Sequence, residues 1–423
     1  TLGLYQELLD KGYLIPFEEI QEESLAEGKA LIIKPSKIPF ISYPYEWTFS
    51  QLKEAAKLTL DIQKIALKYG TQLKDASSYN IQFIGSKPVF IDTLSFEYWT
   101  GDVTWRAYKQ FCQHFLAPLT ICSFCDPRVK ALFVSNLDGI PLDLAKQLIP
   151  KKAYLHPSRF LHLWLHERFQ KLKPLKQNLT EQTFSNIKPS SAAYGLVESL
   201  LSSFKHMKRK EEKSVWKTYY QGDSYQEEAF KEKKNILEKL LPNLKPRVLW
   251  DLGSNEGFFT EAVSKHSQYA VAFDFDLTCI EMMYNRLRSQ GNETILPIHM
   301  DLANPSPGIG WDGKERKGVI ERGPCDVAMA LALVHHLIVT SNIPLNKLVE
   351  FFKNICRDLI IEYIPPFDPK FKQICQTNPL DFSFFTEEMF VETFSKSFVM
   401  KSRIPISQSS RVLYHFQSKG DQT

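Results

Sequence analysis

The sequence lacks a strong excess of charge of either sign. Its 423 residues include 52 Lys and Arg and 48 Asp and Glu, which gives a formal net charge of +4. A protein dedicated to nucleic acid usually carries a concentrated basic surface that neutralises phosphates. The charge balance therefore argues against that class, and we expect no nucleic-acid partner.

Long apolar runs are also absent. A membrane-spanning helix needs about 20 consecutive apolar residues, and the longest apolar segments, residues 115–124 and 327–339, are shorter. The first residues show no basic stretch followed by an apolar one, so we expect no signal peptide. Seven cysteines, an odd number spread over the chain, favour free thiols over a disulfide framework. Together these features predict a cytoplasmic protein without a membrane span.

The composition is that of a globular protein with more than one domain. Apolar residues make up 43% and charged residues 24% of the chain, and a chain of this length usually holds two or three domains. The clearest change of composition is a charge run at residues 205–213. It contains acids as well as bases, so a solvated helix or linker is favoured over a basic binding patch. We therefore predict two domains, residues 1–213 and residues 214–423.

The second half alternates short strand-like runs with helical patterns, which predicts a mostly parallel α/β sheet. The strand-like runs are residues 247–252, 269–274, 294–300, 325–333 and 358–364, and the helical runs are residues 256–266, 278–290 and 345–355. Two final runs, residues 398–404 and 411–416, predict an antiparallel hairpin at the sheet edge. In the first half, β-like pieces at residues 30–33, 38–42, 81–83 and 89–91 precede long helical stretches between residues 105 and 204. This pattern predicts an α+β, mostly helical domain.

A strand, a glycine-rich turn and a helix follow one another at residues 248–258. Gly253 and Gly257 allow a sharp turn and a close approach of a ligand, because neither carries a Cβ. Asp251 would repel a phosphate but suits a ligand with an ammonium group. Asp274 ends the next strand, where a carboxylate can bind both hydroxyls of a ribose. Asp301 ends the third strand, placed to meet an adenine edge.

These residues resemble the class I S-adenosylmethionine-dependent methyltransferases over about residues 223–423. The resemblance implies a Rossmann-like seven-stranded sheet with an antiparallel last strand, and S-adenosylmethionine as the cofactor. The cofactor-binding residues that it implies are Asp251, Gly253 and Gly257 at the methionine part, Asp274 at the ribose, Asp301 and Leu302 at the adenine, and also Asn255 and Leu331. A dinucleotide-binding domain or a plain α/β turn is the alternative.

A narrower resemblance spans nearly the whole chain. Residues 38–47, 304–307 with 310–311, and 330–337 together resemble the host-specific nodulation-type methyltransferase family. This resemblance implies little about the substrate, since such proteins are mostly named by homology.

The candidate catalytic residues are His335, His336 and Glu362. Methyl transfer mainly requires alignment of the acceptor, and a base helps when the acceptor is a hydroxyl or amine. The two histidines follow the fourth strand, and neighbouring helical residues point about 100° apart, so at most one should face the site. Glu362 ends the fifth strand, with a buried carboxylate that shapes the pocket as the alternative role. The long connection at residues 304–324 is either an acceptor clamp or a solvated loop.

A second resemblance concerns the first half. Asp75, Asn80 and Asp92 have the order and spacing of the catalytic Asp and the two metal ligands of a protein-kinase catalytic lobe. Residues 38–47 would then be a strand and hinge, and residues 49–69 the helix before the loop. No H-x-D and no upstream G-x-G-x-x-G is present. The sequence therefore indicates a degenerate kinase-like (C-lobe-like) domain without expected activity.

A possible zinc site has little support in the sequence. Cys122 and Cys125 form a solitary C-x-x-C, with Cys112 and His114 nearby. Buried thiols are favoured over zinc because a second pair is missing, and we expect no metal.

The function predicted from the sequence is S-adenosylmethionine-dependent methyl transfer to an O- or N-nucleophile by a bacterial-type enzyme. The acceptor, whether a small molecule, a glycan or a protein, is not identified by the sequence. Two alternatives stay open. One is a kinase-like binding or regulatory protein whose methyltransferase fold binds the cofactor without turnover, and the other is a dual kinase-methyltransferase.

Overall fold

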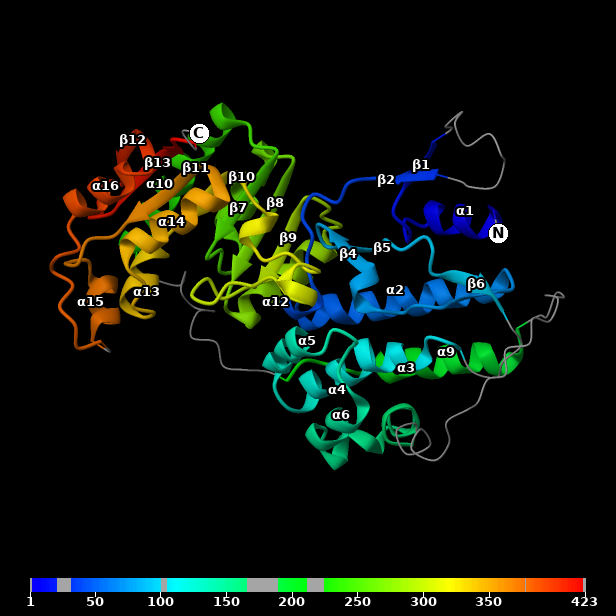
Figure 1. Cartoon of the computed structure of the whole chain (residues 1–423). Coiled ribbons are helices and arrows are strands. Elements are labelled where there is room, and N and C mark those ends of the chain that lie inside the picture. The colour runs from blue at the N-terminus through cyan, green and yellow to red at the C-terminus, as the bar shows by residue number, and fades with distance from the viewer. Residues whose placement is uncertain are drawn as a thin grey trace. The chain divides into compact units, whose positions relative to one another are not determined.

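The computed structural model describes residues 2–20, 32–99, 105–165, 189–210, 224–376 and 378–420. The chain divides into two compact units, Thr1–Glu212 and Lys213–Thr423, here called unit 1 and unit 2 (Figure 1). The predicted domain boundary falls within residues 211–223, outside the described residues.

The described part of unit 1 combines three small antiparallel strand pairs with one helix of 20 residues and several shorter helices. The pairs are β1–β2, β3–β6 and β4–β5. Its strands are β1 (Phe17–Ile20), β2 (Ile32–Pro35), β3 (Thr71–Leu73), β4 (Ile81–Ile84), β5 (Lys87–Phe90) and β6 (Phe96–Tyr98). Its α-helices are α1 (Leu2–Asp10), α2 (Phe49–Lys68), α3 (Tyr108–Phe111), α4 (Ala117–Phe124), α5 (Leu132–Ser135), α6 (Leu142–Leu148), α7 (Pro157–Arg159) and α9 (Ser191–Phe204). Its other helical turns are η2 (Pro44–Glu46), η3 (Ser78–Asn80), η4 (Cys112–Leu116), η5 (Pro127–Ala131), η6 (Lys151–Leu155) and η7 (Phe160–Leu165).

The expected strand at residues 38–42, and with it the strand proposed within residues 38–47, is wrong. The backbone N–H of Ser42 donates to Oε1 of Gln82, and Nε2 of Gln82 donates to the carbonyl of Ser42, both at 2.9 Å. A side-chain amide therefore takes the two backbone groups of Ser42 that a neighbouring strand would otherwise bind. The run at residues 30–33 overlaps β2, although residues 30 and 31 lie outside the described residues.

The long helical stretches expected between residues 105 and 204 are found in part. Residues 108–124 are continuously helical through α3, η4 and α4, and α9 spans 14 residues. Residues 127–165 instead form short helical pieces. Pro127 begins η5 and Pro157 begins α7, while Pro141 and Pro150 immediately precede α6 and η6. Proline has no N–H and clashes with the preceding turn, so it is tolerated at a helix start and ends any helix before it.

In its described residues, unit 2 contains one seven-stranded sheet in the order β12-β13-β11-β10-β7-β8-β9. Its strands are β7 (Val248–Leu252), β8 (Tyr269–Asp274), β9 (Ile295–His299), β10 (Cys325–Ala330), β11 (Cys356–Tyr363), β12 (Phe398–Pro405) and β13 (Val412–Ser418). Strands β7 to β11 pair in parallel, whereas β13 is antiparallel to both β11 and β12. The predicted Rossmann-like sheet, with its antiparallel last strand, is confirmed.

The helices of unit 2 connect these strands. They are α10 (Ser224–Leu244), α11 (Phe258–Val263), α12 (Leu277–Ser289), α13 (Val334–Val339), α14 (Leu345–Ile355), α15 (Pro369–Cys375) and α16 (Glu387–Ser395), with the short turns η9 (Ser264–His266), η10 (Trp311–Gly313) and η11 (Ile320–Arg322). Predicted helix 345–355 has the bounds of α14, and predicted helix 278–290 differs from α12 by one residue at each end.

Helices cover both faces of this sheet. On one face, alternate strand residues such as Leu249 and Met329 pack with Leu237 of α10 and Met283 of α12 in a single apolar cluster. On the other face, the rings of Phe390 and Phe394 in α16 lie 5.1–5.7 Å from aromatic rings of β13. Because successive strand residues point to opposite faces, runs such as VLWDL are apolar on both sides.

The fourth strand ends earlier than expected. The predicted run was 325–333, but β10 stops at Ala330 because the backbone turns at Ala332, whose φ is 48°. The carboxylate of Glu362 accepts a 2.8 Å hydrogen bond from the N–H of Ala332 and so holds this turn. Residues 331–333 thereby leave the sheet and reach the space beyond its carboxyl edge.

None of the helices in the described ranges combines the length and apolar content that crossing a membrane requires.

Candidate active site

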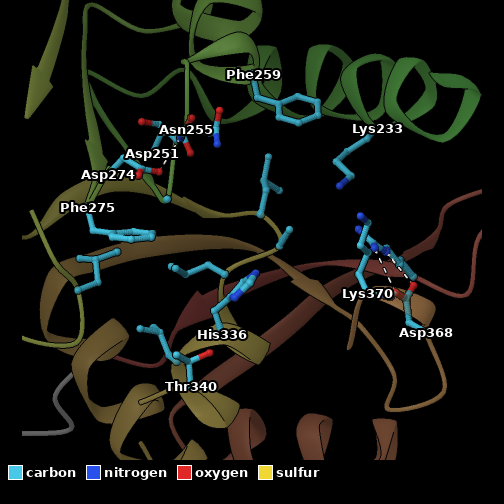
Figure 2. A pocket seen from close by; sticks show the side chains of 18 of the residues that line it. Lys233, Asp251, Asn255, Phe259, Asp274, Phe275, His336, Thr340, Asp368 and Lys370 are labelled. Atoms are coloured by element: carbon cyan, nitrogen blue, oxygen red, sulfur yellow. Dashed lines mark hydrogen bonds and ion pairs between the residues drawn. The ribbon is translucent and has the colours of Figure 1, made fainter. Parts of the chain in front are cut away.

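A cavity of about 610 Å³ lies at the carboxyl ends of β7, β8, β9 and β10. This size is within the range of small-molecule sites, about 300–1,000 Å³. Figure 2 shows Asp251, Asn255 and Asp274 gathered at one end, Lys233 and Lys370 at the other, and His336 between the two ends. We call the first group, together with Asp301, the acidic end. Parallel strands direct their carboxyl termini to one sheet edge, so residues far apart in sequence meet here.

The glycine-rich turn after β7 forms one wall of the acidic end. Gly253 has a φ of 80°, and a Cβ at this position would lie 3.2 Å from Leu333. Asp251 is buried and accepts a 2.5 Å hydrogen bond from the hydroxyl of Thr260. Burial raises the pKa of Asp251 to about 7. A cationic ligand group beside this carboxylate would favour its ionised form.

Asp274 links the second strand to that turn. Its two carboxylate oxygens accept hydrogen bonds from the N–H groups of Asn255 at 2.7 Å and Asp276 at 2.8 Å. Burial raises its pKa to about 6. A carboxylate oxygen has more than one acceptor position, so ligand hydroxyls can bind in addition to these amides.

The predicted adenine-side residues Asp301 and Leu302 follow the third strand, and the predicted cofactor-binding residue Leu331 follows the fourth. Asp301, Leu302 and Leu331 all line the cavity. Asp301 is exposed, and its carboxylate accepts a 2.8 Å hydrogen bond from the N–H of Ala303. The predicted residues Asp251, Gly253, Asn255, Asp274, Asp301, Leu302 and Leu331 are thus brought together at one cavity.

Gly257 does not line this cavity. It begins α11 with a φ of 82°, and a Cβ there would lie 2.3 Å from the side chain of Met283. Its absent side chain therefore serves the packing of α11 on α12 rather than contact with a ligand.

The two candidate histidines on α13 differ in position. His336 lines the cavity, whereas His335 is buried and stacks on Phe371 with ring centroids 6.0 Å apart. Burial, assisted by the positive charge of Arg411, lowers the pKa of His336 to about 4. His336 is therefore neutral near pH 7 and able to accept a proton.

Glu362 lies behind the cavity wall. It is buried, and its Oε2 accepts hydrogen bonds from Nζ of Lys233 at 2.7 Å and from the N–H of Ala332 at 2.8 Å. These bonds connect β11, α10 and the turn after β10. The geometry corresponds to the alternative role, a buried carboxylate that shapes the pocket.

Sequence reasoning missed several lining residues. Phe275 follows the strand-ending acid, is 54% exposed and lines the acidic end. Ser254 is buried in the glycine-rich turn. At the opposite end, Lys233, Lys370 and Arg411 line the cavity. Phe275 and Ser254 could have been identified from the sequence, because each lies next to a motif residue. The three basic residues are far apart in the sequence and follow no local pattern.

Residues 304–324 do not line the cavity as described. They form η10, η11 and a bridge between Ile309 and Arg316, with Trp311 85% exposed. The solvated-loop interpretation therefore fits this connection better than the acceptor clamp.

All seven cysteines are free thiols, and Cys112 and Cys122 are buried. Nδ1 of His114 lies 3.0 Å from the hydroxyl of Ser78, its hydrogen-bond partner. Across the described residues, no group of three or more His, Cys, Asp or Glu side chains is arranged to hold a metal ion.

The kinase-like motif of unit 1 is bonded locally. The carboxylate of Asp75 accepts a hydrogen bond from the N–H of Ser77 at 2.8 Å. Asp92 accepts hydrogen bonds from the N–H of Leu94 at 2.9 Å and the hydroxyl of Ser95 at 2.5 Å. Asn80 reaches the same hydroxyl at 3.5 Å, so Asn80 and Asp92 lie close together.

Nodulation protein NoeA of Rhizobium meliloti (strain 1021) is 32% identical to the chain over 420 residues, covering 97% of this chain and 88% of NoeA. The chain belongs to the NoeA family. The resemblance to a nodulation-type family is thereby confirmed. No protein-family model matches the chain.

Solved structures of methyltransferases are also similar to this NoeA-family chain. N-methyltransferase NodS from Bradyrhizobium japonicum WM9 is 12% identical, with 45% of this chain and 96% of NodS covered and a TM-score of 0.34. The bifunctional kinase-methyltransferase WbdD is 15% identical, with 47% of this chain and 42% of WbdD covered and a TM-score of 0.32. TM-scores at this level do not support a function for this chain. The function proposed below is therefore based on the strand order and on the residues that line the cavity.

Proposed function

We propose that the chain is an S-adenosylmethionine-dependent methyltransferase acting on an O- or N-nucleophile. The observation that carries this proposal is the convergence of Asp251, Asp274 and Asp301 from three adjacent strands on one cavity that also contains His336. A base near a cofactor cavity suits transfer to a group that must lose a proton.

The residues present fit this cofactor. The buried hydroxyl of Ser254 lines the cavity and has no hydrogen-bond partner in the described part of the chain. Buried polar groups are normally satisfied, so this hydroxyl is available to a ligand. The carboxylate of Asp251 suits an ammonium group, Asp274 suits ribose hydroxyls, and Phe275 offers a ring face to a base.

The bound cofactor supplies an activated methyl group. The chain's own residues align the acceptor, exclude water and manage its proton. His336 is neutral near pH 7, because burial lowers its pKa to about 4, and its imidazole takes the proton of an acceptor hydroxyl or amine. Glu362 acts indirectly by holding Lys233 and the backbone of Ala332 in place.

The free state of all seven cysteines supports a reducing, cytoplasmic location as part of this proposal. For unit 1, the order of α2, the loop with Asp75, the β4–β5 hairpin and Asp92 supports a kinase-like scaffold. We propose no phosphotransfer there, since both oxygens of Asp92 accept hydrogen bonds from Leu94 and Ser95.

Calorimetry on the full chain tests the cofactor assignment. S-adenosylmethionine and S-adenosylhomocysteine should bind, and NAD should not. Tight binding of NAD without binding of S-adenosylmethionine would overturn the proposal in favour of a dinucleotide-binding domain. Incubation of labelled S-adenosylmethionine with cell extract should then yield a methylated product. Binding without any labelled product would favour a binding protein without turnover.

A further inference from the structure

Unit 1 carries a basic and apolar surface that is separate from the cavity, since none of the described residues of unit 1 lines that cavity. Residues 144–165 contain four Lys or Arg and no Asp or Glu, whereas the two signs are nearly balanced over the whole chain. These residues form most of α6 and then η6, α7 and η7 in succession, and α6 marks their place in Figure 1. The basic and the exposed apolar side chains of η6, α7 and η7 are here called the η6–η7 surface: Lys151, Lys152, Leu155, Arg159, Phe160 and Leu161.

The apolar part of the η6–η7 surface is open to solvent. Leu155 is 85% exposed, Phe160 40% and Leu161 46%. The N–H of Phe160 donates to the carbonyl of His156 at 3.0 Å, so one helical turn connects Leu155 with Phe160 and Leu161. The ring of Phe160 stacks on that of Trp164 with centroids 4.9 Å apart. A single exposed apolar side chain is common on proteins, but three of them within residues 155–161 form a patch of the kind that marks a contact surface.

The basic part of the same surface gathers on one aromatic ring. Nζ of Lys152 lies 6.0 Å and Cζ of Arg159 lies 5.2 Å from the centroid of Phe124, which is near the end of α4. Each cation is within the range of a cation–π interaction. In the described part of the chain, no ion pair joins either of them to a carboxylate. Two like charges are therefore held together without an acid between them.

The surroundings of this pair are also positive. After burial, the charges of Arg159 and His206 are the causes that lower the pKa of His156. The hydroxyls of Ser158 and Ser202 lie 2.8 Å apart, so α7 contacts the end of α9 that leads to His206.

A further base and one acid lie beside the pair. The N–H of Lys210 donates to the carbonyl of Cys122 at 3.3 Å, close to the ring of Phe124. The carboxylate of Asp126 binds Arg128 at 2.5 Å, so these two residues offset one another. Clustered positive charges of this kind attract anions.

We propose that the η6–η7 surface binds the interface of an anionic lipid bilayer. In such an interface, phosphate groups lie directly above an apolar layer, so both kinds of side chain find a partner there. Leu155, Phe160 and Leu161 would enter the boundary between headgroups and acyl chains, and the lysines and Arg159 would bind lipid phosphates. Nucleic acid also presents phosphates, but it offers no apolar layer for exposed aliphatic side chains. The surface therefore fits a lipid interface better than a nucleic acid.

This contact has two separable contributions. Attraction between lysines and lipid phosphates is screened by salt, because the Debye length falls from about 10 Å at 0.1 M to about 3 Å at 1 M. Burial of the apolar side chains does not depend on screening in this way. Binding that needs both contributions should therefore require anionic lipid and weaken at high salt, and it should also weaken when an exposed leucine is made polar.

Two pairs of exposed lysines in unit 1 give a matched test of the charge. Lys151 and Lys152 belong to the η6–η7 surface, whereas Lys34 and Lys37 are exposed at the end of β2 and just after it. Figure 1 shows β2 and α6 on opposite sides of unit 1. Full-length wild type and the two double Lys→Gln variants are sedimented with vesicles of phosphatidylcholine, alone or mixed equally with phosphatidylglycerol. We expect wild type and the Lys34/Lys37 variant to bind the mixed vesicles equally, and the Lys151/Lys152 variant to bind at least about tenfold more weakly.

Two exposed leucines of unit 1 test the apolar part in the same assay. Leu155 is 85% exposed and Leu94, which lies between β5 and β6, is 76% exposed. Leu155→Ser should weaken binding to the mixed vesicles about fivefold, whereas Leu94→Ser should not change it. Both side chains are mostly in solvent, so neither change should lower the temperature of thermal unfolding.

Each outcome decides the proposal. Absence of wild-type binding to mixed vesicles at about 0.1 M salt, or equal binding by all variants, would overturn it. Equal binding to pure phosphatidylcholine would show that the basic residues take no part, and the proposal would be wrong. Binding to a short DNA duplex, lost in the Lys151/Lys152 variant and unchanged in Leu155→Ser, without vesicle binding, would assign the surface to nucleic acid instead. None of these results depends on methyl transfer, so the proposed function is tested separately.

Discussion

The two units of this chain each contain acidic residues at motif spacing, but they use them differently. In unit 2, Asp251, Asp274 and Asp301 come from three neighbouring strands and line one cavity. In unit 1, Asp75 and Asp92 accept hydrogen bonds from residues two or three positions further along the chain. The first arrangement leaves a shared space for a ligand, and the second closes local turns.

This difference shows why spacing alone is a weak indicator of chemistry. Asp274 also accepts hydrogen bonds from backbone amides, those of Asn255 and Asp276. What distinguishes it from Asp92 is the parallel sheet, which brings other acids and His336 to the same edge. A ligand site needs groups from separate elements to face one space.

The largest effect that would sharpen this comparison is expected at His336. We expect His336→Ala to lower turnover at least about a hundredfold, because a positioned base usually contributes about 10²–10⁴ in rate. The affinity for S-adenosylmethionine should change less than about threefold, since the side chain faces the middle of the cavity. Steady-state kinetics with the identified acceptor and calorimetry measure the two quantities.

His335→Ala is the control for that measurement, because its ring is buried outside the cavity. Full turnover in both histidine variants would show that alignment alone carries the reaction.

The next effect compares the strand-ending acids of the two units. Asp274→Ala should weaken S-adenosylmethionine binding by about 1–3 kcal/mol, because ribose hydroxyls lose their acceptor and two amides lose theirs. Asp92→Ala should leave that affinity unchanged. Calorimetry on both full-chain variants decides this, and equal losses in the two variants would remove the distinction between the units.

Cofactor binding should also depend on pH. Burial raises the pKa of Asp251 to about 7, so this carboxylate is mostly protonated at pH 6 and mostly ionised at pH 8. A ligand ammonium group requires the ionised form, and affinity should therefore fall about tenfold from about pH 8 to about pH 6. Asp251→Asn should bind weakly at both pH values. The same pH dependence in Asp251→Asn would assign the titration to another group.

Unit 2 could be predicted well from sequence for a physical reason. Buried parallel strands are continuous apolar runs, and the residue after each run lies at the ligand edge. This places Asp274 and Asp301 directly. The fourth strand was predicted too long because Leu331 and Leu333 are apolar, although the turn at Ala332 removes them from the sheet.

The basic residues of the cavity and the details of unit 1 could not be predicted in this way. Lys233, Lys370 and Arg411 belong to three segments that meet only in the folded sheet. In unit 1, the apolar run at residues 38–42 reads as a strand, yet its backbone partner is the side chain of Gln82. Long-range contacts of this kind leave no local signal.

At His335 we expect an effect on stability rather than on turnover. Both of its ring nitrogens are buried without a hydrogen-bond partner in the described part of the chain, and the ring packs on Phe371. We expect His335→Ala to reduce the free energy of unfolding by about 1–3 kcal/mol, because it leaves a cavity, while turnover stays within a few-fold. Denaturant unfolding measures the first quantity. A hundredfold loss of turnover with unchanged stability would assign the catalytic role to His335 instead.

The smallest effect is expected for nucleotide binding by unit 1. The oxygens of Asp92 already accept hydrogen bonds from Leu94 and Ser95, and Asn80 contacts the same serine hydroxyl. A Mg²⁺ ion bound by Asp92 would have to displace these hydrogen-bond donors from the carboxylate oxygens. It would also need further oxygen ligands at near-octahedral geometry. Addition of ATP and Mg²⁺ to the full chain should therefore leave its thermal unfolding unchanged. A shift that requires Mg²⁺ and disappears in Asp92→Ala would restore the dual kinase-methyltransferase hypothesis and give unit 1 a ligand site comparable to that of unit 2.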